Sequence, residues 1–204
     1  MNLFRNIFKP TKSDTSKATT LTPPSQGEFL PCYNMPTDEK FLSNFKINGG
    51  KFLYCITLDE VFGALDNILI ENDWYETDVS CNNELLKSKF SGYNLNFEGD
   101  IRSSSFFFST CESLIANNGS ILFSSNQLKE IRLSNYPKNI IVFATTSQLI
   151  EDIGDGLRNI KMKCNGNIPN NITAIKNFTV LDEKNFMSYG SSSKNLYLLL
   201  LEDL

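Results

Sequence analysis

Apolar residues recur at helical spacing in several segments of the chain. From Leu58 to Leu69 they fall at positions i, i+3, i+4, i+7, i+10 and i+11, which predicts an amphipathic helix with one buried face. Thr57-x-x-Glu60 precedes this pattern as a capping box, in which each side chain can satisfy a free backbone N–H group. Similar patterns predict helices over residues 37–48, 83–90 and 147–160.

Short apolar runs lie between these predicted helices. Residues 51–56, 140–144 and 197–202 have the length and composition of buried strands. Weaker strand patterns cover residues 78–81, 93–97, 106–108 and 178–181. Helices that alternate with nearly continuous apolar strands are typical of an α/β domain, in which a mostly parallel sheet is covered on both faces.

A hairpin is predicted where Asn118-Gly119 separates two apolar runs. A type I′ turn needs a positive φ at both central residues, and Asn-Gly is the pair that tolerates this best. Because the two strands of a hairpin are antiparallel, this feature makes the predicted sheet mixed.

The first 26 residues differ in composition from the rest and are predicted to form a disordered basic tail. Residues 11–24 are rich in Ser, Thr, Lys and Pro. Within residues 1–20, four basic side chains and one acidic side chain give a net charge of +3 (4 − 1). A folded domain is therefore expected over residues 37–204.

A short amphipathic pattern precedes the linker-like stretch. One side of a helix over residues 1–9 would carry four apolar side chains, Leu3, Phe4, Ile7 and Phe8. Such a basic amphipathic segment can dock into a protein partner or lie on a membrane surface as a peripheral contact. The alternative is a frayed tail, because isolated helices of fewer than ~12 residues are marginal in water.

The composition excludes several kinds of chemistry. The 204-residue chain contains no histidine, which removes Ser-His-Asp and Cys-His catalysis and His metal ligands. Its five cysteines are scattered and show no C-x-x-C, as expected of reduced thiols rather than disulfides or an iron–sulfur site. No metal ligand, cofactor or catalytic residue is assigned. A net charge of −4 and a pI near 5.0 disfavour nucleic acid as a partner.

The chain shows no apolar stretch long enough to span a membrane. Its first residues lack the continuous apolar core and the small-residue cleavage site of a secretory signal. Together with the cysteine pattern, these features predict a cytoplasmic protein.

Three polar segments are candidates for binding a small anion. Asn117, Asn118, Gly119 and Ser120 form a polar loop that a ligand could approach closely. Thr145 and Thr146 stand at a predicted strand-to-helix junction, where free N–H groups attract anions. Ser191, Ser192 and Lys194 combine small residues with a positive charge. The alternatives are a hairpin turn, an ordinary helix cap and a surface connection.

Ser124, Ser125 and Asn126 form a further polar stretch at the end of the second hairpin strand. Their side chains could donate hydrogen bonds to a ligand or form a turn.

Three stretches are similar to motifs of one protein family. Ala116-Asn117-Asn118-Gly119-Ser120 stands where that family has A-E-T-G-T. Tyr136 to Val142 matches a Pro-Ile-Val run before a helix, and Tyr189 to Leu198 resembles a closing G-x-x-E-L-x-L strand entry. On these motifs, residues 37–204 resemble the LUD-domain family, which includes LutC-like lactate-utilisation proteins.

The resemblance implies a fold, a class of ligand and a class of partner. The fold would be the three-layer α/β/α sandwich of CoA-transferase-like and sugar-phosphate-isomerase proteins, which bind anionic small molecules. The partners would be the iron–sulfur subunits of a complex that oxidises L-lactate to pyruvate. Since this chain has no cluster ligands of its own, any redox centre would lie in a partner.

The chain departs from the family at the motif itself. Asn117 stands at the position of the family's glutamate, and an amide cannot act as a general base or form an acyl intermediate. We therefore expect a non-catalytic or accessory LUD-domain protein that binds a small anionic ligand or a protein partner. Two alternatives stay open: an accessory subunit in lactate utilisation, and an active CoA-type or sugar-phosphate-type enzyme that uses a carboxylate from elsewhere in the chain.

Overall fold

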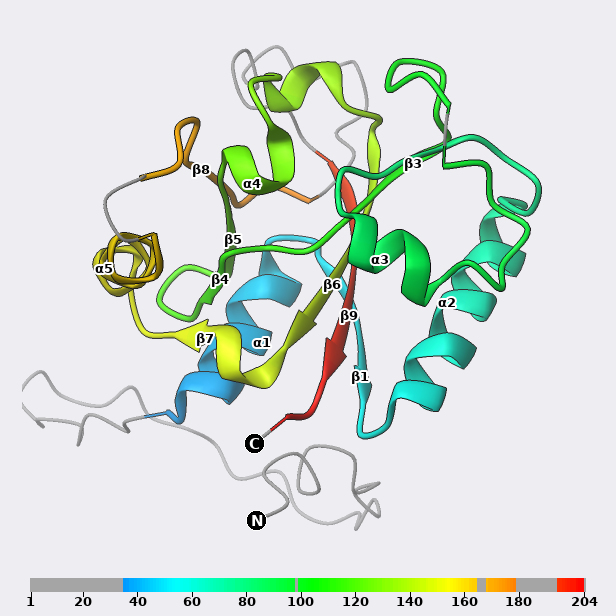
Figure 1. Ribbon diagram of the computed structural model, residues 1–204. Helices are drawn as coiled ribbons and strands as arrows, with labels where there is room; N and C mark the ends of the chain where they lie inside the picture. Colours follow the sequence, from blue (N-terminus) through cyan, green and yellow to red (C-terminus); the bar gives the residue numbers. More distant parts are fainter. Residues whose placement is uncertain (1–34, 98, 165–167, 179–193, 204) are drawn as a thin grey trace, which may run out of the picture. The chain divides into compact units, whose positions relative to one another are not determined.

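The computed structural model describes residues 35–97, 99–164, 168–178 and 194–203 (Figure 1). The predicted tail over residues 1–26, with Leu3, Phe4, Ile7 and Phe8, lies outside the described residues, as do Ser191 and Ser192. Most of the strand predicted over residues 178–181 also lies outside them. No helix in the described part of the chain is long and apolar enough to cross a membrane.

A five-stranded parallel sheet, with strand order β1-β9-β6-β3-β2, forms the centre of the domain. Its strands are β1 (Lys51–Cys55), β2 (Val79–Ser80), β3 (Phe106–Ser109), β6 (Asn139–Thr145) and β9 (Asn195–Leu201). The two central strands pair along their full length, from Asn139 opposite Asn195 to Thr145 opposite Leu201. Both faces of these strands are buried, which explains their nearly continuous apolar sequences.

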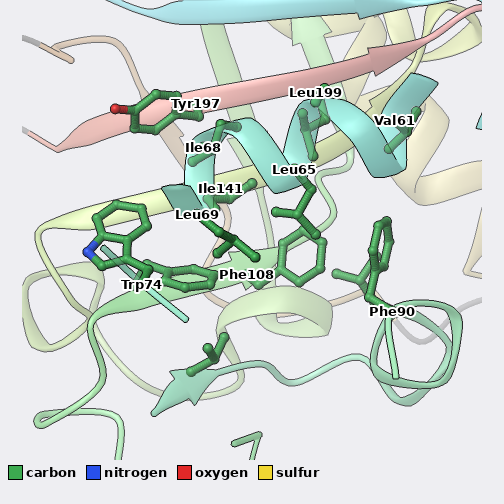
Figure 2. Packing of buried hydrophobic residues seen from close by; sticks show 14 of the residues in the cluster. Val61, Leu65, Ile68, Leu69, Trp74, Phe90, Phe108, Ile141, Tyr197 and Leu199 are labelled. Atoms are coloured by element: carbon green, nitrogen blue, oxygen red, sulfur yellow. The ribbon is translucent and has the colours of Figure 1, made fainter. Parts of the chain in front are cut away.

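Helices α2 (Leu58–Asn72) and α3 (Glu84–Lys89) cover one face of this sheet (Figure 2). The predicted capping residue Thr57 accepts a hydrogen bond from the N–H of Glu60, at 3.2 Å. The apolar stripe of α2 packs on alternate residues of the strands, among them Phe108 and Leu199. The ring of Trp74 stacks on Phe106 with 5.0 Å between centroids. This face confirms the α/β fold class expected from the sequence.

A second sheet lies on the opposite side of the parallel sheet from α2 (Figure 1). Its strand order is β7-β4-β5-β8, and its strands are β7 (Leu149–Ile150), β4 (Ser113–Ile115), β5 (Ser120–Phe123) and β8 (Thr173–Ile175). This side of the domain also carries five helical segments: α1 (Thr37–Ile47), α4 (Ser125–Leu128), α5 (Ile153–Lys163), η1 (Leu133–Asn135) and η2 (Thr146–Gln148).

The expectation of one mixed sheet is corrected by this arrangement. The antiparallel hairpin is β4–β5, and it belongs to the second sheet, so the central sheet is entirely parallel. The reason is that β3, which precedes the hairpin, already pairs with β2 on one side and β6 on the other. No free edge beside β3 is left for the hairpin to join.

The hairpin turn also differs from the expected type I′ turn. Four residues connect the strands, and the N–H of Gly119 donates to the carbonyl oxygen of Ile115 at 2.9 Å. Gly119 has a φ of +64°, whereas Asn118 is not among the residues with positive φ. The longer loop needs only one left-handed residue, so the conformational freedom of glycine is used at that position alone.

The helix predicted over residues 147–160 begins later than expected. Leu149 and Ile150 pair with Leu114 and Ile115 as strand β7, and α5 begins only at Ile153. Asp152 caps α5, because its carboxylate accepts the N–H of Asp155 at 3.0 Å. Edge pairing with β4 therefore overrides the helical spacing of these two apolar residues.

The helix predicted over residues 37–48 is observed as α1, which follows Pro36 and begins without a capping hydrogen bond. The strand predicted over residues 93–97 appears only as an isolated bridge between Asp78 and Asn96, although Tyr93, Leu95 and Phe97 pack against the hydrophobic core.

Candidate functional site

The hairpin loop that carries the predicted site residues is held against helix α1. The Asn44 side-chain amide donates to the carbonyl oxygen of Ala116 at 2.8 Å, and the Asn48 amide donates to that of Asn118 at 2.7 Å. A Cβ on Gly119 would lie 2.8 Å from the carbonyl oxygen of Asn44 and closer still to backbone atoms of the helix. This loop therefore packs directly on the backbone of α1.

The side chains of the loop already have partners within the chain. The Lys40 ammonium donates to the side-chain oxygen of Asn117 and to the carboxylate of Glu151. The hydrogen bond from Lys40 lowers the pKa of Glu151 below its usual value. The Asn118 side-chain oxygen accepts from the N–H of Ser120 at 3.0 Å and from its hydroxyl at 2.6 Å. These contacts use the groups that were expected to face an anion.

Thr145 and Thr146 lie at the carboxyl end of β6, where the chain enters the three-residue helix η2. Thr145 and Gln148 form a capping pair, in which the N–H of Thr145 donates to the side-chain oxygen of Gln148 at 2.8 Å. The N–H of Ser147 and the hydroxyl of Thr146 both donate to the carboxylate of Asp203, at 2.8 and 2.9 Å. This junction binds a carboxylate, as its N–H groups predict, and that carboxylate comes from the same chain.

The hydrogen bonds at this junction change the acidity of Asp203. Burial acts to raise the pKa of its carboxyl group, but the hydrogen bonds from Ser147, Thr145 and Thr146 lower the pKa below its usual value. Asp203 follows β9, the strand next to β6, so the parallel pairing of these two strands brings the partners together.

Lys194 is buried at the start of β9. Its side chain is 3% exposed, and its ammonium donates to the carbonyl oxygens of Tyr136 and Pro137, at 2.8 and 3.1 Å. Burial lowers the pKa of Lys194 to about 8, with a smaller effect from Lys138. Lys194 was expected to lie in an open anion-binding loop. Its ammonium instead donates to backbone carbonyl groups that precede β6, so the expectation is not met at this residue.

The described residues of the three predicted segments lie at different places in the fold. Lys194 precedes β9 at the amino edge of the parallel sheet, whereas Thr145 and Thr146 end β6 at the carboxyl edge. The loop of Asn117 to Ser120 lies at the end of the second sheet, against α1.

Sequence reasoning missed Glu112, which lies just after the carboxyl end of β3. One carboxylate oxygen of Glu112 accepts three hydrogen bonds: from the Ser124 hydroxyl at 2.6 Å, the Asn126 amide at 2.9 Å and the Gln127 amide at 3.2 Å. Ser124 and Gln127 are also the capping box of α4. The available signals were a glutamate directly after a buried strand and the Ser-x-x-Gln pattern that follows the hairpin.

The position of Glu112 is one where α/β proteins commonly bind ligands. The chain leaves β2 toward α3 on one face of the sheet and leaves β3 toward the second sheet on the other (Figure 1). Adjacent parallel strands whose connections part in this way leave a crevice beyond their carboxyl ends. Asn82, which follows β2, donates to the carbonyl oxygen of Gln127 at 2.8 Å and so joins the end of β2 to α4.

The buried thiols take no part in these clusters as nucleophiles. Burial raises the pKa of the Cys55 thiol to about 11, and burial also raises the pKa of Cys81 and Cys111. Within the part of the chain that the structure describes, no three His, Cys, Asp or Glu side chains are grouped to hold a metal ion.

Comparisons with known proteins agree on the class of this domain. The LUD domain matches residues 39–195 of the chain. Among solved structures, the chain is similar to a DUF162 family protein from Deinococcus radiodurans, with a TM-score of 0.57 over 82% of this chain and 96% of that chain. The two sequences are 10% identical, so the likeness is one of fold. A comparison with curated proteins gives no match.

Proposed function

Since this chain belongs to the LUD-domain family, we propose that it is an accessory, non-catalytic member, in which the hairpin loop at the family motif has a structural role. The observation that carries the proposal is the contact between the loop and α1. Asn44 and Asn48 bind its carbonyl groups, and Gly119 packs against the helix backbone. A loop fixed in this way supports the orientation of α1 on the domain.

The chemistry of the loop supports the same proposal. Asn117 stands where the family motif has a glutamate, and its side-chain oxygen accepts a hydrogen bond from Lys40. An amide in that position offers neither a general base nor a nucleophile. Lys40 also forms an ion pair with the carboxylate of Glu151, which lies at the surface of the domain.

The partner that this proposal implies is another protein subunit. The resemblance to lactate-utilisation proteins suggests that this partner subunit carries an iron–sulfur centre. The sequence of this chain offers no cluster ligands of its own, so the centre would lie in the partner. The cysteines that the structure describes are free, as expected of a protein that works in the reducing cytoplasm. Deletion of residues 1–26 is expected to weaken capture of such a subunit if Leu3, Phe4, Ile7 and Phe8 form the contact, and unchanged capture would contradict that contact.

Thermal unfolding of the purified protein with lactate, pyruvate, CoA, acyl-CoAs and sugar phosphates tests the non-catalytic assignment. A ligand at 100 times its Kd would stabilise the protein by about 2.7 kcal/mol, which at this length shifts Tm by about 5–11 °C. We expect no specific shift from these compounds.

Two variants separate a structural loop from a binding loop. Asn44→Ala removes the hydrogen bond to Ala116 and should cost about 1 kcal/mol of stability. Asn117→Ala removes only an exposed contact and should change stability by no more than about 0.5 kcal/mol. A ligand-induced Tm shift that disappears in Asn117→Ala would overturn the proposal.

A further inference from the structure

We propose that the cluster around Glu112, at the carboxyl ends of β2 and β3, binds a small primary ammonium compound. The proposal does not depend on the assignment of the hairpin loop, because none of its residues belongs to that loop. It rests on a carboxylate without a cationic partner among the described residues, on the hydrogen-bond acceptors left free in the cluster, and on a buried hydroxyl without a partner on the same side of the sheet.

Among the described residues, the carboxylate of Glu112 has no cationic partner. The described part of the chain contains three ion pairs, and none of them involves Glu112. Its three hydrogen-bond donors are a hydroxyl and two amides, all bound to the same oxygen, Oε1. The side chain is half-buried, so its charge is less well solvated than that of an exposed glutamate. A bound cation would neutralise it.

The cluster leaves several hydrogen-bond acceptors free. The amide nitrogen of Asn126 donates to Glu112, and that of Asn82 donates to Gln127 and to the hydroxyl of Tyr136. Among the described residues, the side-chain oxygens of Asn82 and Asn126 and the second oxygen of Glu112 have no hydrogen-bonding partner. A ligand for such a site must bring donors, and a primary ammonium group has three donors and no acceptor.

A hydroxyl or a metal ion suits the cluster less well. A ligand hydroxyl brings one donor to the three free acceptor oxygens, and it has no charge with which to neutralise Glu112. Divalent cations prefer several carboxylates, whereas the described residues group no three acidic or thiol side chains for a metal.

Ser80 is a further polar group without a partner on this side of the sheet. Its side-chain oxygen is buried and lacks a hydrogen-bonding partner within the described residues, and Ser80 is 3% exposed. Ser80 is in register with Phe107, so both side chains point to the same face of the sheet. The ring of Phe107 packs on Tyr136, with 4.3 Å between centroids.

These contacts place Ser80 in the same layer as the Glu112 cluster. Tyr136 accepts a hydrogen bond from Asn82 at 2.8 Å, and Asn82 also binds the backbone of Gln127. A buried hydroxyl without a partner is rare in proteins and usually marks a missing water or ligand.

The site is open to solvent on the side of α4. Asn126 is exposed, whereas Glu112, Asn82 and Gln127 are half-buried and Ser124 is buried. A small ligand can therefore reach the free oxygen of Glu112 past Asn126 without unfolding of the surrounding strands.

The experiment is a titration of the full-length protein with ethylammonium chloride, followed by the side-chain amide signals of Asn126 and Gln127 in 15N-resolved NMR spectra. Tetramethylammonium chloride, which has the same charge but no N–H donor, and potassium chloride serve as controls at equal ionic strength. We expect a saturable shift of both signals with ethylammonium alone. No saturable shift, or an equal shift with either control salt, would overturn the proposal.

Variants link the shift to the cluster. Glu112→Gln keeps the size of the side chain and removes the charge, so affinity should fall about tenfold or more. Glu71→Gln makes the same change at an exposed position on α2 and should bind like the wild type. Asn126→Ala, at an exposed position, should weaken binding several-fold as judged by the Gln127 signal. Unchanged affinity in Glu112→Gln or in Asn126→Ala would overturn the proposal, and Asn126→Ala decides the question if Glu112→Gln does not fold.

Discussion

Gly119 in the hairpin loop packs against the backbone of Phe45 in helix α1. A Cβ built on Gly119 would overlap the amide nitrogen of Phe45 and would lie 2.8 Å from the carbonyl oxygen of Asn44. Gly119 also has a φ of +64°, which disfavours other residues. Asn-Gly therefore serves two purposes here: it turns the chain, and it lets the turn approach a helix backbone.

This contact predicts opposite effects for two glycine substitutions. Gly119→Ala should cost about 2 kcal/mol or more, because neither the backbone angle nor the neighbouring helix accepts a side chain. Gly63→Ala, inside α2 with nothing within 4 Å of a new Cβ, should stabilise the protein by about 0.5–1 kcal/mol. Urea unfolding of both variants checks this, and equal effects would contradict the close contact at Gly119.

Lys194 predicts a rise in stability at alkaline pH. Its pKa in the folded protein is about 8, below the ordinary value of 10.5, so the unfolded chain binds more protons between these two pH values. The contribution of Lys194 to the free energy of unfolding is therefore least favourable below pH 8. It becomes more favourable as the pH rises from 8 toward 10.5. The measurement is the free energy of unfolding of wild type relative to Lys194→Met at pH 7, 8, 9 and 10.

The Lys194→Met reference removes other alkaline titrations from this comparison. The buried thiols, whose pKa values are raised, act in the opposite direction, because the folded state then keeps protons that the unfolded state loses. Both proteins share that effect, so it cancels in the difference. A difference that is flat from pH 7 to 10 would contradict a lowered pKa for Lys194.

The carboxylate of Asp203 predicts a loss of stability in acid. Its folded pKa is lowered, so its contribution is present above the ordinary value of 3.8 and is lost as pH falls through the folded pKa. Asp203→Asn should therefore destabilise the protein at pH 7. The difference in the free energy of unfolding between this variant and the wild type should become smaller as the pH is lowered toward 3. Unfolding curves at pH 7, 5, 4 and 3 test this, and a constant gap would indicate that the hydrogen bonds from Thr146 and Ser147 do not favour the ionised form.

The thiols predict an order of chemical modification. Alkylation requires an accessible thiolate, whereas Cys55, Cys81 and Cys111 are buried, with pKa values raised by that burial. Cys164 is half-buried and should react first among the four cysteines that the structure describes. Mass spectrometry after timed treatment with iodoacetamide at pH 8 measures the order, with urea-unfolded protein as the control for full reactivity. Early modification of Cys111 in the folded protein would contradict its burial.

Elements with a strong local pattern were predictable from the sequence. The helix after Thr57 has six apolar residues on one face and a capping pair at its start, and these signals do not depend on the rest of the chain. The strand predicted over residues 140–144 appears as β6 because a continuous apolar run fits a strand buried on both faces. The helix was predicted to begin at residue 147, which is too early, because Leu149 and Ile150 pair with the edge of β4. The local sequence pattern does not reveal that pairing.

The candidate sites were harder to predict because their partners are remote in the sequence. Asp203 meets Thr146 only because β9 lies beside β6, and Lys40 meets Asn117 only because α1 packs on the hairpin loop. Lys194 appears in the sequence as part of a polar loop, yet the fold buries its ammonium against Tyr136 and Pro137.

The sequence by itself determined the class of domain, the family resemblance and the absence of histidine chemistry, since each of these follows from residue types and local spacing. The tertiary structure decided which polar groups are already used and which are left over. Glu112 illustrates the division: its place after a buried strand is visible in the sequence. Its three donors on one oxygen and its lack of a cation depend on how the second sheet and α4 pack beside β3. Hydrogen bonds and charges act over a few ångströms in space, and only the folded chain fixes which residues lie within that range.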